Sequence, residues 1–125
     1  MEIINKQHED ITFNQRVELA EYLRVEKKEF YFSAACNLNL GIIPGLFMHF
    51  INDDDRWLFY LNSEDDGFKT IARSGKNSAL VVNVSLCSLF LRRTRCGAGT
   101  KFPIKKTEAK INNNPIYEIL INKAF

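Results

Sequence analysis

The stretch from Leu46 to Val84 constrains the fold of this chain more than any other part of the sequence. An apolar run from Leu46 to Ile51 is followed by the polar residues 52–55 and then by a second, aromatic run from Trp57 to Leu61. Two strand-like runs joined by about four polar residues are typical of a β-hairpin. We therefore expect a hairpin at the centre of the fold.

The apolar spacing changes after this hairpin. Between Glu64 and Lys76 the apolar positions, Phe68, Ile71 and Ala72, have the three- and four-residue spacing of a helix, and Gly75 is placed to end it. Ala79 to Val84 returns to β-branched residues that are apolar on both faces, as in a strand covered from both sides. The sequence thus predicts hairpin, short helix and buried strand in succession.

The rest of the chain supplies further short elements. Thr12 and Gln15 have the form of a capping box, and behind them Phe13, Val17, Ala20 and Leu23 share one helical face. We expect a helix at 13–27, strands at 30–35 and from 42 into the hairpin, further strands at 86–91 and 100–111, and a final helix from Asn114-Pro115 to about 123.

These elements predict an α+β fold: a six-stranded antiparallel β-barrel with peripheral helices, closed so that few strand edges are exposed. A length of 125 residues predicts a single domain spanning 1–125, with residues 1–11 as a flexible arm or short edge strand. The 46% apolar share excludes a disordered chain, and ten Phe residues suggest a core with aromatic layers.

Several features bear on location and chemistry. No run approaches the roughly 18 apolar residues of a membrane span, and the N-terminus is too polar for a signal peptide, so we expect a cytoplasmic protein without a membrane segment. The three cysteines follow no C-x-x-C spacing, which fits free thiols in a reducing compartment. With only His8 and His49 in the chain, we expect no metal site.

The net charge of +2 conceals an asymmetry between the two halves. Residues 1–66 hold six basic and thirteen acidic side chains, whereas residues 67–125 hold eleven basic and two acidic ones. One interpretation is that the halves interleave in space and neutralise each other. The other is that the second half holds an anionic ligand such as a phosphate, a nucleotide or nucleic acid.

Three segments together resemble a known family. They are FYFSAACNLNLGIIPGL at 30–46, MHFINDDDRWLFYLNS at 48–63 and GFKTIARSGKNSALVVNV at 67–84. Their order resembles the flavin-binding split barrel of the pyridoxamine-phosphate-oxidase-like family: an opening strand and proline-bearing second strand, a hairpin ending in a small polar residue, and a lysine-bearing helix before an apolar strand. The match covers roughly residues 13–84.

The resemblance implies a homodimer with FMN, or a related phosphorylated cofactor, at the interface, and a possible flavin-dependent oxidoreductase. In that family the cofactor phosphate is held by the polar residue that closes the hairpin and by the lysine of the following helix. Apolar strand faces around Phe47, Trp57 and Phe59 would be covered by the second subunit. Carried onto this sequence, the cofactor-binding candidates are Asn62, Ser63, Lys69, Arg73 and Arg92.

Other candidate groups have a simpler interpretation. Glu64, Asp65 and Asp66 at the predicted helix start would act as a structural cap rather than attract a phosphate. His49 is expected to be a hydrogen-bonded wall residue rather than a general base. The acidic run 53–55 is expected to be a solvated hairpin turn. The sequence therefore names no catalytic residue.

The basic segment from Arg92 to Lys110 supports a second hypothesis. It holds seven basic residues and one acid, Glu108, with Phe90 and Phe102 nearby. Basic residues near aromatic ones on a sheet can bind single-stranded nucleic acid, although lysines on an edge strand also serve to prevent aggregation. The alternative function is a non-catalytic binding protein that engages nucleic acid, a nucleotide or an acidic protein partner.

Overall fold

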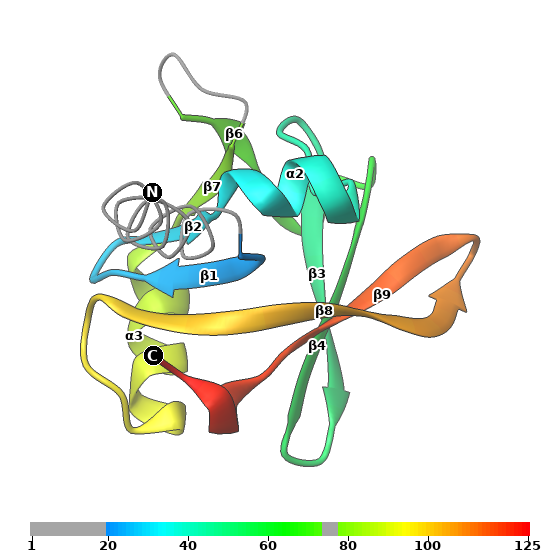
Figure 1. The fold of residues 1–125 in the computed structure, drawn as a ribbon. Helices are drawn as coiled ribbons and strands as arrows, with labels where there is room; N and C mark the ends of the chain where they lie inside the picture. Colours follow the sequence, from blue (N-terminus) through cyan, green and yellow to red (C-terminus); the bar gives the residue numbers. More distant parts are fainter. Residues whose placement is uncertain (1–19, 74–77) are drawn as a thin grey trace, which may run out of the picture.

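The computed structural model describes residues 20–73 and 78–125. In this part of the chain nine strands combine with two α-helices and a 3-10 turn (Figure 1). The elements are β1 (Tyr22–Val25), β2 (Glu29–Phe32), α2 (Ala34–Leu40), β3 (Phe47–Asp53), β4 (Arg56–Asn62), β5 (Phe68–Lys69), β6 (Ile71–Ala72), β7 (Ala79–Val82), α3 (Val84–Thr94), β8 (Thr100–Ile111), β9 (Asn114–Ile119) and η1 (Ile121–Lys123).

The strands form one antiparallel sheet in the order β5-β3-β4-β9-β8-β1-β2-β7-β6. The long strand β8 runs across the middle of the molecule and pairs with β1 through its first residues and with β9 through the rest (Figure 1). Pairs of strands from the acidic and basic halves of the chain interleave in this order, because β4 pairs with β9, β1 with β8, and β2 with β7. The first interpretation of the charge asymmetry, in which the two halves interleave, is therefore the arrangement seen.

The two end strands of the sheet are consecutive in the sequence, with Thr70 between them. Thr70 is fully buried, and both its backbone N–H (2.8 Å) and its hydroxyl (2.7 Å) donate to the carbonyl of Leu46. The backbone N–H of Gly45 donates to the carbonyl of Thr70 in return (2.9 Å). This seam brings the ends of the sheet together, so the α+β barrel is confirmed, whereas the count of six strands is wrong.

The predicted hairpin is confirmed as β3 and β4. Its register pairs Met48 with Leu61 and Phe50 with Phe59, so these four side chains point into the barrel. The turn residue Asp54 has a φ of 50°, a left-handed conformation that aspartate tolerates better than most residues. The strands predicted at 79–84 and 100–111 are also present, as β7 and β8.

The helix predicted at 13–27 is wrong where the structure describes it, since Tyr22–Val25 is the strand β1; residues 13–19, like the arm at 1–11, lie outside the described residues. Leu23 and Val25 alternate with Tyr22 and Arg24, so the sequence fits a strand as well as a helix. Pairing with β2 and β8 on both sides buries Leu23 and Val25 completely. Burial against strands that are distant in the sequence therefore decides that this segment is a strand rather than a helix.

The helix predicted at 64–76 is also wrong. Residues 68–69 and 71–72 are the short strands β5 and β6, and residues 74–77 lie outside the described part of the chain. This segment has only three apolar positions, too few to stabilise a helix by packing. The hydrogen bonds of Thr70 to Leu46 hold it against β3 instead.

The strand predicted at 86–91 is the helix α3, and the strand predicted at 30–35 ends at Phe32 as β2, before the short helix α2. Asn83 caps α3 by accepting a hydrogen bond from the backbone N–H of Leu86 (2.8 Å). Leu86, Cys87 and Phe90 then recur at helical spacing and are buried. A run of apolar residues this short does not distinguish a buried strand from a buried helix by composition, but the cap and the spacing do.

The final helix predicted from Asn114 is the strand β9, followed by the single turn η1. Asn112 and Asn113 both have positive φ, 48° and 67°, which is the conformation of a two-residue type I′ hairpin turn. The polar run at 112–114 therefore joins β8 to β9 in a second hairpin, rather than capping a helix.

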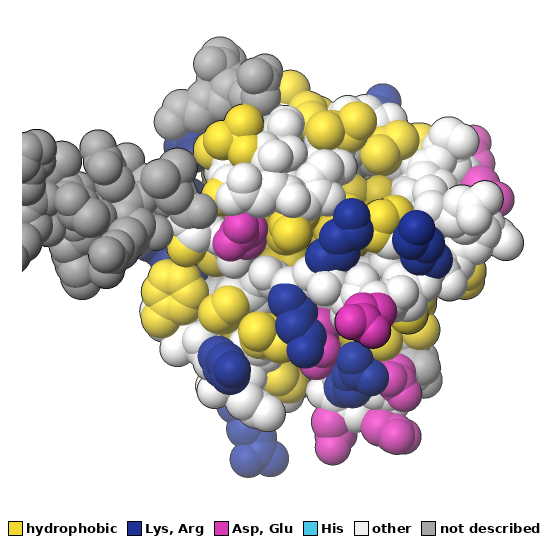
Figure 2. All heavy atoms as spheres, turned by 45° about the vertical axis from the view of Figure 1, so that its right-hand side comes forward, with side chains coloured by type: hydrophobic (Ala, Val, Ile, Leu, Met, Phe, Trp, Pro, Cys, Tyr) yellow, Lys and Arg dark blue, Asp and Glu magenta, His cyan; other side chains and the backbone are white. Residues whose placement is uncertain are grey.

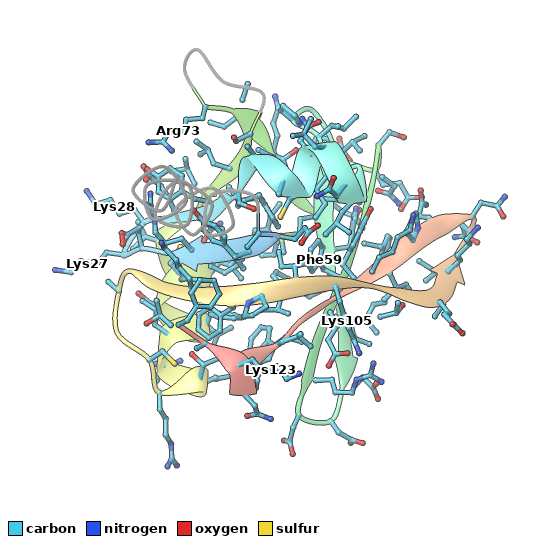
Figure 3. All side chains as sticks on the ribbon, in the orientation of Figure 1. Lys27, Lys28, Phe59, Arg73, Lys105 and Lys123 are labelled. Carbon is cyan, nitrogen blue, oxygen red and sulfur yellow. The ribbon has the colours of Figure 1, made fainter. Side chains whose placement is uncertain are left out.

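The core contains the aromatic layers that the Phe content suggested. Phe90 of α3 contacts the rings of Phe30 and Phe102 at centroid distances of 5.4 and 5.1 Å, and all three are fully buried. Phe59, labelled near the centre of Figure 3, stacks on Tyr117 at 5.2 Å. Because α3 packs on the inner face of β2 through Phe30, the helix covers the barrel interior on that side.

Candidate functional site

A hollow of about 850 Å³ lies between the β3–β4 hairpin and α3, with η1 at its edge. In Figure 1 these three elements approach one another in the lower part of the molecule. The volume lies within the range of about 300–1,000 Å³ that is usual for small-molecule sites. The lining residues are Phe50, Ile51, Asp54, Asp55, Arg56, Trp57, Phe68, Leu86, Leu89, Arg93, Thr94, Ile121 and Asn122.

Three aromatic side chains in this lining, Phe50, Trp57 and Phe68, are only partly buried. Phe50 meets Trp57 and Phe68 edge to face at 5.7 and 6.0 Å, and Trp57 rests on Phe90 of the core at 4.6 Å. The inner faces of β3 and β4 supply Phe50 and Trp57, since the hairpin register places them on the same side as Phe59. The core therefore holds these rings in place while part of their surface stays accessible.

Charged residues of both signs line the hollow at its edge. Arg56 is held by carboxylates, with nitrogen–oxygen distances of 3.1 Å to Asp53 and 3.1 Å to Glu118. The hydrogen bond and charge of Arg56 lower the pKa of Glu118, while Glu118 in turn raises the pKa of Arg56. Arg93 of α3 makes no ion pair within the part of the chain that the structure describes. Arg93 is thus the cation at this site that remains open to a ligand.

The predicted phosphate ligands at the end of the hairpin, Asn62, Ser63 and Lys69, do not line the hollow. The Asn62 side-chain oxygen accepts hydrogen bonds from His49 Nε2 (2.7 Å) and from the backbone N–H of Glu64 (2.9 Å). Ser63 is exposed, and Lys69 is exposed on β5. Asn62 and Lys69 lie on opposite sides of Phe47, each directly paired with it. They therefore share the outer face of the sheet, away from the hollow.

The two arginine candidates lie in different places. Arg73 follows β6 and lines a separate, smaller pocket around Tyr31. Arg92 is exposed in the last turn of α3, where its neighbour Arg93 lines the hollow and Arg92 does not. The structure thus places Asn62 and Lys69 on one face of the sheet and Arg73 and Arg92 elsewhere. Phe50, Phe68 and Arg93, which line the hollow, were not among the residues predicted to bind a cofactor. If residues 84–94 had been recognised as a helix, their spacing would have shown which side chains share the face of α3 that lines the hollow.

The remaining polar candidates are structural. The His49 ring stacks on Tyr60 at 4.9 Å, and its Nδ1 faces Asp66 at 3.8 Å. Gly67 packs so closely against this ring that an added Cβ would lie 2.7 Å from it. His49 is therefore fixed as a wall residue, as the sequence suggested.

The cysteines are free thiols, and two of them are buried. Burial raises the pKa of Cys36 and of Cys87 to about 11. Both thiols are therefore protonated at neutral pH and are poor nucleophiles.

The basic segment at 92–110 is divided between the end of α3 and β8. Lys101 lies over the ring of Tyr22 at 5.1 Å, and Lys105 pairs with Glu118 at 3.6 Å. On the face drawn in Figure 2, Lys and Arg side chains are interspersed with hydrophobic and acidic ones. This face therefore presents no continuous basic stripe.

Within residues 20–73 and 78–125, no group of three or more His, Cys, Asp or Glu side chains is arranged to hold a metal ion. No helix in the same residues is long and apolar enough to cross a membrane. Comparisons of the chain with protein-family models, with curated proteins and with solved structures found no match. The site must therefore be interpreted from its own geometry.

Proposed function

We propose that the protein binds a planar aromatic cofactor carrying a phosphate in the hollow between the β3–β4 hairpin and α3. The observation that carries this proposal is the set of partly exposed rings of Phe50, Trp57 and Phe68 lining a hollow of about 850 Å³. Rings held edge to face by a core present flat apolar surfaces against which another planar ring can pack. FMN is the member of this ligand class to which the sequence resemblance points.

The charges at the edge give the ligand an orientation. A phosphate would be attracted to Arg93, whose planar guanidinium suits bidentate hydrogen bonding to phosphate oxygens. The carboxylates of Asp54 and Asp55 on the hairpin side would repel it. The phosphate therefore lies at the α3 side of the hollow and the aromatic ring system at the hairpin side. This assignment replaces Asn62, Ser63 and Lys69 by Arg93 as the phosphate ligand.

The catalytic part of the proposal is a flavin-dependent oxidoreductase. A bound flavin supplies the hydride chemistry, while the protein binds and orients it and limits the access of water. The aromatic rings and Arg93 that line the hollow are suited to binding and orienting a flavin.

Assembly as a homodimer is also part of the proposal. Of the three residues expected to need a partner, Phe59 is fully buried within its own chain, and Phe47 and Trp57 are half-buried. Exposed apolar side chains also occur elsewhere, among them Ile43 and Leu38. Light scattering at micromolar concentration tests the dimer directly, since a mass near 14.5 kDa contradicts it.

A titration with two flavins tests the proposed function. FMN and riboflavin share the ring system, but only FMN carries a phosphate. We expect FMN to bind about tenfold more tightly than riboflavin, the effect of one charge-assisted hydrogen-bonded group, when flavin fluorescence is followed at constant ionic strength. Arg93→Gln should remove this preference, and the neighbouring variant Arg92→Gln should keep it. The proposal is wrong if neither flavin binds at saturating concentration.

The same preparation tests the alternative, a non-catalytic protein that engages nucleic acid through its basic segment. Neutralising four to six phosphates of a single strand would give a log–log salt slope of roughly −3 to −4. Because Lys105 is paired with Glu118 and Lys101 rests on Tyr22, we expect an oligonucleotide to show a much shallower slope. A steep slope together with no flavin binding would favour the alternative.

A further inference from the structure

A second pocket lies on the opposite face of the sheet from the hollow. Side chains along β2 alternate, so Phe30 and Phe32 point into the barrel and Tyr31 points outward. Around Tyr31 is a pocket of about 340 Å³, large enough for a small molecule. Its lining residues are Tyr22, Arg24, Tyr31, Phe32, Ser33, Ala34, Arg73 and Ser78.

Two guanidinium groups meet at the ring of Tyr31. Arg24 is the direct cross-strand partner of Tyr31, and its Cζ lies 4.6 Å from the ring centroid. Arg73 follows β6, which lies on the opposite side of β2 from β1 in the sheet. Its Cζ lies 5.2 Å from the same centroid. Since both carbons lie close to one ring, they are at most about 10 Å apart. The fold thus brings together two cations that are far apart in the sequence.

Neither guanidinium is neutralised by the described residues. Arg24 and Arg73 form no ion pair with a described carboxylate, and the buried Arg24 Nε has no hydrogen-bond partner among residues 20–73 and 78–125. A buried donor without a partner costs free energy unless something accepts its hydrogen. Two adjacent positive charges also repel each other. Both features would be relieved by an anion in the pocket.

Two polar side chains at or beside the pocket, Glu29 and Ser33, already have hydrogen-bond partners within the protein. Glu29, the carboxylate next to Tyr31, is hydrogen-bonded to the Tyr31 hydroxyl, and this bond is the main cause that raises the pKa of Tyr31. Ser33 donates to the carbonyl of Ala20 (2.7 Å) and accepts from the backbone N–H of Tyr22 (3.1 Å). Arg24 and Arg73 are the charged groups of the lining and are left to bind a ligand.

We propose that this pocket binds a small molecule carrying a phosphate or carboxylate group, with the oxyanion held between Arg24 and Arg73. An arginine fork can donate two parallel hydrogen bonds to the two oxygens of a carboxylate or to two oxygens of a phosphate. The rings of Tyr22 and Tyr31 offer apolar contact to the rest of the molecule. In Figure 3, Arg73 lies on the same side of the molecule as Lys27 and Lys28, whose charges would help to attract an anion.

This site is independent of the proposed flavin site. Phe30 contacts Phe90 beneath the hollow, while its neighbour Tyr31 faces the pocket on the other side of the same strand. Substitutions of Arg24 and Arg73 should therefore leave flavin binding unchanged. Failure of one proposal leaves the other intact.

The experiment is a calorimetric titration of the full chain with inorganic phosphate and, separately, with succinate, at constant ionic strength. We expect saturable binding of at least one of them, and the tighter one identifies the oxyanion class. Arg73→Gln should weaken that binding about tenfold, and the double variant Arg24→Gln/Arg73→Gln should abolish it. Arg92→Gln, an exposed arginine outside the pocket, is the matched charge control and should bind within about twofold of the unsubstituted protein.

Arg73 is exposed, so its substitution should leave the fold intact, and equal thermal melting curves verify this. Two results would overturn the proposal. One is the absence of saturable binding for both phosphate and succinate. The other is an equal loss of affinity in Arg73→Gln and Arg92→Gln, which would mean that only the net charge of the protein matters.

Discussion

The aromatic hollow and the two-arginine pocket differ in how the fold assembles them. The hollow is formed on the inner side of the barrel, from a hairpin, a helix and a terminal turn that pack on a shared core. The pocket is formed on the outer side, from cross-strand neighbours and the end of a short strand. The inner site therefore depends on apolar burial, whereas the outer one depends on charge. One strand, β2, serves both because its side chains alternate between the two faces.

The largest expected effect on stability compares the inner and outer faces of β2 at two adjacent residues, Phe30 and Tyr31. Phe30→Ala removes a fully buried ring that contacts Phe90 and Phe50, and it should lower the free energy of unfolding by about 3–5 kcal/mol. Tyr31→Ala removes a ring from the outer face and two cation–π contacts, and it should cost only about 1 kcal/mol. Urea denaturation of both variants measures the difference. Similar losses would show that the two faces are equally buried.

The next effect concerns the seam that closes the barrel. Thr70→Val keeps the shape of the side chain but removes the hydroxyl that donates to the carbonyl of Leu46 and accepts from its N–H (3.1 Å). The variant leaves the N–H of the half-buried Leu46 without this acceptor, and we expect a loss of about 1–3 kcal/mol in the free energy of unfolding. Thr107→Val, at a half-buried hydroxyl outside the seam, is the control. A loss at Thr70 no larger than at Thr107 would mean that the seam contributes little.

The sequence predicted one part of the inner side well. The β3–β4 hairpin has strong local signals, since two apolar runs flank a polar turn and the alternation fixes which side chains point inward. Trp57 was therefore recognised in a strand. Its place in a hollow was not, because that depends on α3, which lies far along the chain and was taken for a strand.

Other parts of the fold could not be predicted because distant pairing overrides local preference. Tyr22–Val25 fits a helix until β2 and β8 bury Leu23 and Val25. The meeting of Arg24 and Arg73 depends on β2 and β7 lying between β1 and β6, a topology that no local signal carries. By contrast, the Asn83 cap and the Asn112–Asn113 turn are local features, although the sequence pattern predicts a strand through Asn83 and a helix from Asn114.

The smallest effect lies at the edge of the hollow and depends on pH. Arg56 lowers the pKa of Glu118 below its ordinary value of 4.5, so the charged form of Glu118 stabilises the folded state. This contribution is present above pH 4.5 and is lost as the pH falls through the lowered pKa. Glu118→Gln should therefore reduce the free energy of unfolding at pH 7 by less than about 1 kcal/mol, and the difference should vanish in acid.

Chemical denaturation from pH 7 to pH 3 measures this effect. Glu108→Gln, an exposed glutamate on β8 that makes no ion pair with a described residue, is the matched control. If the difference in the free energy of unfolding between Glu118→Gln and the unsubstituted protein grew as the pH falls, it would contradict a lowered pKa of Glu118.

Trp57 allows the central claim, that the hollow binds a planar aromatic cofactor, to be tested directly. It is the one tryptophan in the sequence, and it lines the hollow, so the intrinsic fluorescence of the full chain reports on this site. On titration with FMN, we predict saturable quenching of Trp57 emission, after correction for flavin absorption, that Arg24→Gln/Arg73→Gln leaves unchanged. Emission from Trp57 that stays constant at saturating FMN would contradict the account.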